Sequence, residues 1–364
     1  MDRALPPPAR PLGRIAARLA AAIAAAALAL QPLAAQSILR DAETEALLRD
    51  MATPLVAAAG LDPKNVDIVL VSDPAINAFV VGGQAVYLNT GLIGEAGSAN
   101  EVQGVIAHEL GHVVGGHALG GGGSREATGI TLLSMLAGLA AALAGAGDAA
   151  MGIIGAGQQA ALGKYLAFSR GQESTADAAG ASFLAKAGIS GRGSVDFFKK
   201  LQNLQYRSGY SSLDPEAQFY STHPSSGDRI ATLTDVYEKD PAWTKPSDPA
   251  LERRFQLVKA KLYGYVAEPR LTLQAYPEHV KTPPARYARA YAFHKEAMID
   301  KALAEADALL AEEPNNPYFL EIKGQVLLES GKAREALAPL RRATALTGNQ
   351  PLIASTFGHA LIAT

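Results

Sequence analysis

The stretch His108-Glu109-Leu110-Gly111-His112 constrains this chain more than any other. Histidines four residues apart lie on one face of a helix, so their two imidazoles can bind one metal ion. The glutamate next to the first histidine then lies within reach of a water on that metal. The pattern therefore predicts a helix that carries a metal centre with a base beside it.

The neighbouring residues predict where this helix begins and ends. Ser98 and Glu101 form a capping box, in which each side chain binds a backbone N–H at the start of the helix. Gly115 and Gly116 follow the last apolar position and provide a stop signal. Between these bounds the apolar residues gather on a face separate from the two histidines: Val102, Ile106, Leu110 and Val113.

The spacing His-Glu-x-x-His is typical of zinc peptidases, whose catalytic sites need a third protein ligand and leave a fourth position for water or substrate. His117 misses the metzincin spacing by one residue, because position 118 is Ala118. We therefore assign His117 to helix-end packing or to a hydrogen bond that supports a ligand. Glu173 is the better candidate for the third ligand.

Glu173 and Asp177 stand four residues apart, so on a helix both carboxylates project from one face. One carboxylate can bind the metal while the other orients a ligand, because a metal-bound histidine usually donates its second ring N–H to a carboxylate. We expect Asp177 to orient His108 in this way.

The chain carries four motifs in this order: Asn77-Ala78-Phe79 before a Gly-Gly turn, the His-Glu-x-x-His helix followed by His117-Ala118, the pair Glu173 and Asp177, and Thr222-His223-Pro224-Ser225 leading to Arg229-Ile230. Together these motifs resemble the gluzincin metallopeptidases of the HtpX/BepA and CAAX-prenyl-protease type, and the C-terminal part is similar to their periplasmic BepA-like branch. The resemblance implies one Zn²⁺ per chain, held by His108, His112 and Glu173. It also implies Glu109 as the general base, with His223 and Arg229 as an active-site pair outside the inner ligand set.

The expected chemistry is hydrolysis of a peptide bond, in which Glu109 takes a proton from the metal's water and passes it to the leaving amine. Three roles stay open for His223: a donor to the oxyanion, a ligand that blocks the open zinc position, or an ordinary loop histidine. We expect Arg229 to anchor its loop by pairing with a carboxylate.

Short β-branched and apolar runs over Val66–Val71, Ile76–Val81 and Ala85–Leu88 predict a small sheet before the metal helix. Gly82-Gly83 predicts a tight hairpin between the last two runs. An edge strand beside such a helix can bind an extended peptide by strand addition. We expect this substrate-binding edge to consist of Val86, Tyr87, Leu88 and Asn89.

The first 35 residues have the pattern of a secretory signal peptide, with four arginines before an apolar run and a small-residue cleavage site after Ala35. The chain has no cysteine, which excludes disulfides and a lipid-modified N-terminal cysteine. A periplasmic location follows from the family resemblance. The formal net charge of −2 without a basic cluster argues against a nucleic-acid partner.

A stretch rich in Gly, Ala, Leu and Ile separates the two parts of the predicted site. Residues 130–147 are 18 uncharged residues, and a second uncharged run follows Asp148 up to Gly163. Such alanine- and glycine-rich runs are only weakly lipophilic, so we expect residues 125–165 to form a helical hairpin that is buried or lies on a membrane surface. We expect this hairpin to gate substrate entry or to make peripheral membrane contact.

The C-terminal part repeats with a period of 34 residues, which is the tetratricopeptide period. Pairs that match at this shift are Pro317 and Pro351, Gly324 and Gly358, Ala302 and Ala336, and Leu303 and Leu337. Residues 285–364 hold about two and a half copies, so we expect them to pack on the peptidase part or to continue in a longer chain. They are either a helical cap or a docking surface for a partner.

These features predict an α+β, mostly helical fold: a zincin-like metallopeptidase domain with a small β-sheet over residues 36–284, then a helical domain of tetratricopeptide type. The resemblance implies a periplasmic zinc endopeptidase that cuts misfolded or stalled outer-membrane proteins, with repeats that contact the outer-membrane assembly machinery. The alternative is a chaperone or assembly factor with a closed or regulatory zinc site. An intact Glu109 favours the enzyme, because structural zinc has four protein ligands and needs no base. An integral-membrane prenyl-protein protease is disfavoured by the signal peptide.

Overall fold

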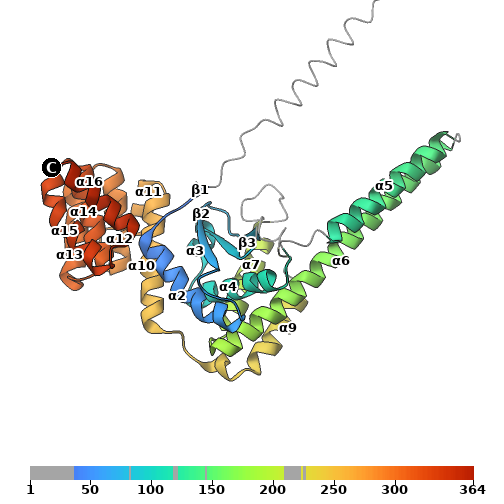
Figure 1. Ribbon diagram of the computed structural model, residues 1–364, viewed down its shortest axis with the longest axis horizontal. Coiled ribbons are helices and arrows are strands. Elements are labelled where there is room, and N and C mark those ends of the chain that lie inside the picture. Colours follow the sequence, from blue (N-terminus) through green and yellow to red (C-terminus); the bar gives the residue numbers. More distant parts are fainter. Residues whose placement is uncertain (1–36, 82, 118–121, 144–145, 209–222, 224–226) are drawn as a thin grey trace, which may run out of the picture. The chain divides into compact units, whose positions relative to one another are not determined.

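The computed structural model describes residues 37–81, 83–117, 122–143, 146–208, 223 and 227–364. The predicted signal peptide, residues 1–35, lies outside these ranges. The chain is mostly helical, with one small sheet early in the sequence and a purely helical region at the C-terminal end (Figure 1), which confirms the predicted fold class. Among the described helices, none combines the length and the apolar character needed to cross a membrane.

The sheet has the strand order β1-β2-β4-β3. Strand β2 pairs with β4 in parallel, and β3 pairs with β4 antiparallel with Val81 opposite Ala85, which confirms the predicted hairpin. Gly83 has a φ of 123°, a conformation open to glycine but not to residues with a side chain. The strands are β1 Ser37–Ile38, β2 Asp67–Ser72, β3 Ala78–Val81 and β4 Ala85–Asn89.

Strand β4 contains Val86, Tyr87, Leu88 and Asn89, the residues predicted to be the substrate-binding edge. The predicted edge position was wrong, because β4 lies between β2 and β3 and its backbone groups pair with both neighbours. Val86 and Leu88 are fully buried, as is usual for a strand inside a covered sheet. Strand β3 is the edge strand at this end of the sheet. It packs beside the helix that is predicted to bind the metal.

That helix, α4, spans Ala99–Val114 and lies in the main core. Ser98 caps it as predicted, since its hydroxyl accepts the Glu101 N–H at 3.2 Å. The Glu101 carboxylate accepts the Gly97 N–H at 2.8 Å, one residue earlier than in a standard capping box. Helices packed around α4 and the sheet include α2 Ala42–Ala58, α3 Thr90–Glu95, α7 Arg192–Ser208 and α10 Pro249–Val266. Helix α9, Gly227–Glu238, packs on α7.

Two long helices form the predicted hairpin: α5, Gly122–Leu143, packs along the first part of α6, Gly147–Ala187 (Figure 1). The second part of α6 packs against α4. One continuous helix therefore runs from the apolar hairpin to the core that holds the predicted site. It ends where Gly188 adopts the left-handed conformation, with a φ of 65°.

The C-terminal region consists of helical pairs that repeat every 34 residues. Helices α12, α14 and α16 begin at Pro283, Pro317 and Pro351, and α13 and α15 keep the same interval. The first repeat thus begins two residues before the predicted boundary at residue 285, and its tetratricopeptide type stays a prediction. The elements after residue 240 are η2 Pro241–Thr244, α11 Pro269–Ala275, α12 Pro283–Lys295, α13 Ile299–Glu312, α14 Pro317–Glu329, α15 Ala333–Leu346 and α16 Pro351–Ile362.

The prolines between residues 268 and 284 predict an extended segment, but the structure forms helix α11 within it. Pro269 is the first residue of this helix, where its missing N–H removes no intrahelical bond and its fixed φ suits the helix. The proline that suggested an extended segment therefore starts a helix instead.

A buried charged network joins the peptidase part to the repeats. Lys261 of α10 is 3% exposed, and its Nζ lies 2.5 Å from Asp41 Oδ2 and 3.2 Å from Glu43 Oε2. The Tyr287 hydroxyl of α12 donates to the same Glu43 oxygen at 2.7 Å. Because buried charges are tolerated only when they are paired, these contacts fix α2, α10 and α12 against one another.

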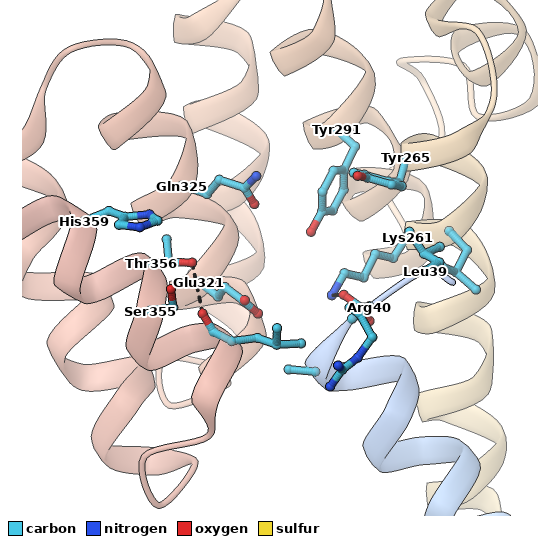
Figure 2. Close-up of a pocket in the computed structure, with 14 residues that line it drawn as sticks. Leu39, Arg40, Lys261, Tyr265, Tyr291, Glu321, Gln325, Ser355, Thr356 and His359 are labelled. Carbon is cyan, nitrogen blue, oxygen red and sulfur yellow. Dashed lines mark hydrogen bonds and ion pairs between the residues drawn. The ribbon is translucent and has the colours of Figure 1, made fainter. Parts of the chain in front are cut away.

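A cavity of about 300 Å³ lies beside this network (Figure 2). Lys261 of α10 lines it from the peptidase part, and Tyr291 of α12, Glu321 of α14 and His359 of α16 line it from the repeats. The Oε2 atom of Glu321 is buried without a hydrogen-bond partner among the described residues. Burial raises the pKa of this carboxyl from 4.5 to about 7. The folded chain therefore holds a proton on Glu321 that the unfolded chain releases at lower pH.

We predict that the free energy of unfolding falls as the pH rises from about 4.5 through about 7, because Glu321 must lose its proton in the folded chain. In Glu321→Gln this fall should be smaller by roughly 1–3 kcal/mol. The variant should unfold at a higher temperature than wild type near pH 8 and at a similar temperature near pH 5. Thermal unfolding followed by circular dichroism measures both. The matched change Glu312→Gln at an exposed position should alter the midpoint equally at the two pH values. An equal effect of both substitutions would contradict the prediction.

Candidate metal centre and active site

Helices α4 and α6 cross with their backbones in contact. A Cβ on Gly111 would lie 2.5 Å from the carbonyl oxygen of Ala176, closer than real Cβ atoms approach any backbone oxygen. A Cβ on Gly180 would lie 3.0 Å from the carbonyl oxygen of Ala107. The glycine inside the His-Glu-x-x-His motif is therefore needed for packing. The crossing brings the polar side chains on either side of these contacts together.

The three predicted ligands meet at this crossing. His108 Nε2 lies 3.1 Å from His112 Nε2 and 3.3 Å from Glu173 Oε2, and His112 Nε2 lies 3.2 Å from Glu173 Oε1. All three side chains are buried. A tetrahedral zinc ion with bonds of about 2.0–2.1 Å separates its ligand atoms by about 3.3–3.4 Å. The spacing and the donor types therefore fit Zn²⁺.

The charges of the site also fit a divalent cation. The buried carboxylates of Glu173 and Asp177 pair with the Arg229 guanidinium, and the buried Glu109 faces His223. Burial raises the pKa of Glu173 and Asp177, but hydrogen bonds to His108 and other groups outweigh it, so both carboxyls keep a pKa below the usual range. Burial likewise lowers the pKa of His108, yet hydrogen bonds to Asp177 and Glu173 raise it to about 9. Buried carboxylates beside imidazole nitrogens are a donor set that suits a metal dication.

His108 and Glu173 are held from behind by a second pair of side chains. His108 Nδ1 lies 2.9 Å from Asp177 Oδ1, which leaves Nε2 facing the ligand cluster. The Arg229 guanidinium binds Asp177 with two nitrogens, at 2.5 and 2.7 Å, and its Nη2 also lies 3.0 Å from Glu173 Oε2. Asp177 and Arg229, both expected from the sequence, thus meet at the ligands and fix their orientation.

His117 supports the other histidine. Its Nδ1 lies 2.8 Å from Nδ1 of His112, so His112 presents its Nε2 to the ligand cluster. Burial and the nearby His112 lower the pKa of His117, which favours a neutral ring that can accept the His112 N–H. The sequence offered helix-end packing or a supporting hydrogen bond for His117, and the contact matches the second.

Glu109 and His223 line the same centre. Glu109 is 1% exposed, and its Oε1 has no hydrogen-bond partner among the described residues, although His223 Nε2 is 3.5 Å away. His223 Nδ1 lies 3.3 Å from His108 Nε2 and 3.0 Å from Glu173 Oε1. One atom from each of His108, His112, Glu173 and His223 lies within 4.8 Å of the others. His223 is therefore positioned as a fourth donor.

Phe198 of α7 is a site residue that the sequence did not suggest. The Arg229 guanidinium lies over its ring at 4.7 Å, and the His108 ring meets it edge to face at 6.1 Å between centroids. From the sequence alone, its position in α7 indicates only an aromatic side chain of the core.

Beside the centre, a cavity of about 410 Å³ runs between α6 and α9, lined partly by small and apolar side chains: Ala178, Ala181, Leu233 and Val236.

The predicted substrate residues of β4 are not part of this cluster. They lie in the middle of the sheet, between β2 and β3. The residues that the structure brings together are thus the three predicted ligands with Glu109, Asp177, His223 and Arg229.

Comparisons with known proteins identify a family of peptidases. The model of peptidase family M48 matches residues 39–236. The beta-barrel assembly-enhancing protease of Yersinia pestis is 25% identical over 303 residues, which cover 80% of this chain and 60% of that protein. The protein of the same name from Escherichia coli strain K12 is 28% identical over 293 residues, 78% of this chain and 58% of that protein. Metalloprotease LoiP of the same strain is 29% identical over 184 residues, 49% of this chain and 64% of that protein. The chain thus spans about 60% of the length of the assembly-enhancing proteases.

Proposed function

This chain belongs to peptidase family M48, and from that membership we propose that it is an exported zinc-dependent endopeptidase acting on misfolded or stalled outer-membrane proteins. The observation that carries the proposal is the buried set His108, His112 and Glu173 with the Glu109 carboxylate beside it. The substrate class is drawn from the relatives named beta-barrel assembly-enhancing protease.

The chemistry divides between the metal and the side chains around it. Zinc held by His108, His112 and Glu173 would act as a Lewis acid, acidifying water and polarising the peptide carbonyl. Glu109 is the general base, because its buried Oε1 is available to take a proton and then to give it to the leaving amine nitrogen. Asp177 and Arg229 keep the ligands oriented, so that little reorganisation accompanies the reaction.

The substrate would bind along β3 rather than along β4. Strand β3, Ala78–Val81, is at the end of the sheet and packs beside α4. An extended peptide added to this edge would form main-chain hydrogen bonds, which tolerate many side chains and suit unfolded substrates. The cavity between α6 and α9 would receive an apolar side chain next to the ligands.

His223 supports a closed resting state of the same enzyme. Its Nδ1 stands where a fourth ligand lies in a closed site, and its Nε2 faces Glu109. Substrate would then have to displace His223 before Glu109 can act. This position also favours a second candidate function, a chaperone or assembly factor whose zinc site stays closed.

The proposed location is the periplasm, and the proposed partners are unfolded or misassembled proteins. The predicted signal peptide supports export, and the names of the relatives support contact with β-barrel assembly. The helical repeats would bind either the substrate or the assembly machinery on their surface.

Glu109→Gln should lower proteolysis of casein or of an unfolded porin by at least about 100-fold, because a catalytic proton transfer contributes that much. Zinc content should stay at the wild-type level, since Glu109 is not among the three ligands. Initial rates and metal analysis on the same preparations measure both effects. Glu238→Gln, at an exposed position of α9, serves as the matched control and should leave both unchanged. Full proteolysis by Glu109→Gln would remove the enzyme proposal.

His223→Ala should raise proteolysis, by about tenfold if the closed state is favoured by about 1.4 kcal/mol, because the variant no longer closes the site. The exposed His279→Ala is the control and should change nothing. The double variant Glu109→Gln with His223→Ala should be inactive, which excludes a contaminating protease. Loss of activity in His223→Ala with zinc retained would contradict closure and assign His223 to the oxyanion.

A further inference from the structure

The α5–α6 hairpin exposes a concentration of large apolar side chains. Met151 is 71% exposed, Leu133 69% and Leu136 66%. We call the whole set the hairpin surface: Leu132, Leu133, Met135, Leu136 and Leu139 of α5, with Met151, Ile153, Leu162, Leu166 and Phe168 of α6. Exposed apolar area of this kind in a soluble protein marks an interaction site.

The inner faces of the two helices are already used. A Cβ on Gly157 would lie 2.0 Å from the Cβ of Ser134, so the α5 and α6 backbones approach closely through small residues. Packing through small residues is typical of helices that associate inside a membrane, where the hydrophobic effect does not drive their contact. The inner faces of α5 and α6 therefore pack on each other, and the hairpin surface lies on their outward sides.

The outward sides lack the polar face of an ordinary surface helix. At about 100° per residue, the exposed apolar side chains of α5 spread over about 160° around the helix. A helix that fits a protein groove or lies flat on a membrane has a narrow apolar stripe opposite a polar face. On the hairpin surface, the apolar side chains instead cover a wide arc of the helix. This arrangement fits lipid that surrounds the hairpin better than it fits a protein groove that contacts one side.

The charge pattern and the length point to one leaflet of a lipid bilayer. Residues 130–163 contain a single charged residue, Asp148, and the exposed Lys164 and Arg170 follow along α6. Cationic side chains at the end of an apolar segment suit the headgroup level. The 12 residues from Leu132 to Leu143 extend for about 18 Å, close to half of the roughly 30 Å hydrocarbon core.

We propose that the distal part of the α5–α6 hairpin inserts into the acyl layer of one leaflet of a membrane. The same helix α6 then carries Glu173, 20 residues beyond Ile153 and so about 30 Å along its axis. Insertion would hold the metal ligands at a set height above the lipid surface, where substrates of a membrane-assembly pathway emerge. The insertion does not depend on peptidase activity and is tested without it.

The test uses the absence of cysteine in the chain. Leu136→Cys, labelled with an environment-sensitive fluorophore, should shift its emission to the blue when the full chain meets vesicles of phosphatidylethanolamine and phosphatidylglycerol, and brominated acyl chains should quench it. The matched control is Ile362→Cys, at a position that is 86% exposed in the last repeat helix, and it should do neither. Pure phosphatidylcholine vesicles should give the same shift, because the acyl layer rather than the headgroup is recognised. No shift at Leu136→Cys, or equal shifts at both positions, would overturn the proposal.

A loss-of-binding variant completes the test. Leu133→Asp with Leu136→Asp should reduce flotation with vesicles by at least about tenfold, whereas Leu361→Asp with Ile362→Asp should float like wild type. Zinc content and circular dichroism report whether each variant is folded. If the label at Leu136→Cys shifts on adding an unfolded protein or on raising the concentration of the chain alone, but not with vesicles, the surface binds protein and the proposal is wrong.

Discussion

The site depends on the backbone contact between α4 and α6. His108 and His112 are on one helix and Glu173 on the other, so the ligands meet only if the helices touch where Gly111 faces Ala176. A side chain at position 111 would separate the helices and pull the carboxylate away from the rings. The motif glycine thus has a packing role as definite as the chemical role of the histidines, and stability and metal binding are coupled at that position.

Around this crossing, buried charge is arranged in two levels. Glu173 faces the ligand atoms, while Asp177, Arg229 and His117 hold those groups from behind. The ligands and the groups behind them are tolerated in the core because they pair with one another. The Glu109 Oε1 atom, which has no hydrogen-bond partner among the described residues, lies beside the centre, where a base is needed. His223, which precedes α9 in the chain, completes the set with its Nδ1 at 3.0 Å from Glu173 Oε1.

Local periodicity made much of this predictable. Residues four apart predicted the helix faces of α4 and α6, Ser98 predicted a cap, and the 34-residue period predicted the repeats, because each signal needs only neighbouring residues. The place of β4 inside the sheet was not predictable, since strand order depends on pairing between distant segments. Pro269 misled for a similar reason: proline breaks a helix interior yet favours its first turn. Phe198 and the buried Glu43–Lys261–Tyr287 network left no local signal at all.

The central claim is that one divalent cation is held jointly by His108, His112 and Glu173. X-ray absorption at the zinc edge, recorded on the purified chain together with its metal content, tests this most directly. We expect one zinc per chain, with imidazole nitrogens and a carboxylate oxygen at about 2.0–2.1 Å, and a weakened or altered site in Glu173→Gln. A chain that binds no stoichiometric metal, or a zinc spectrum that is the same in wild type and Glu173→Gln, would contradict it.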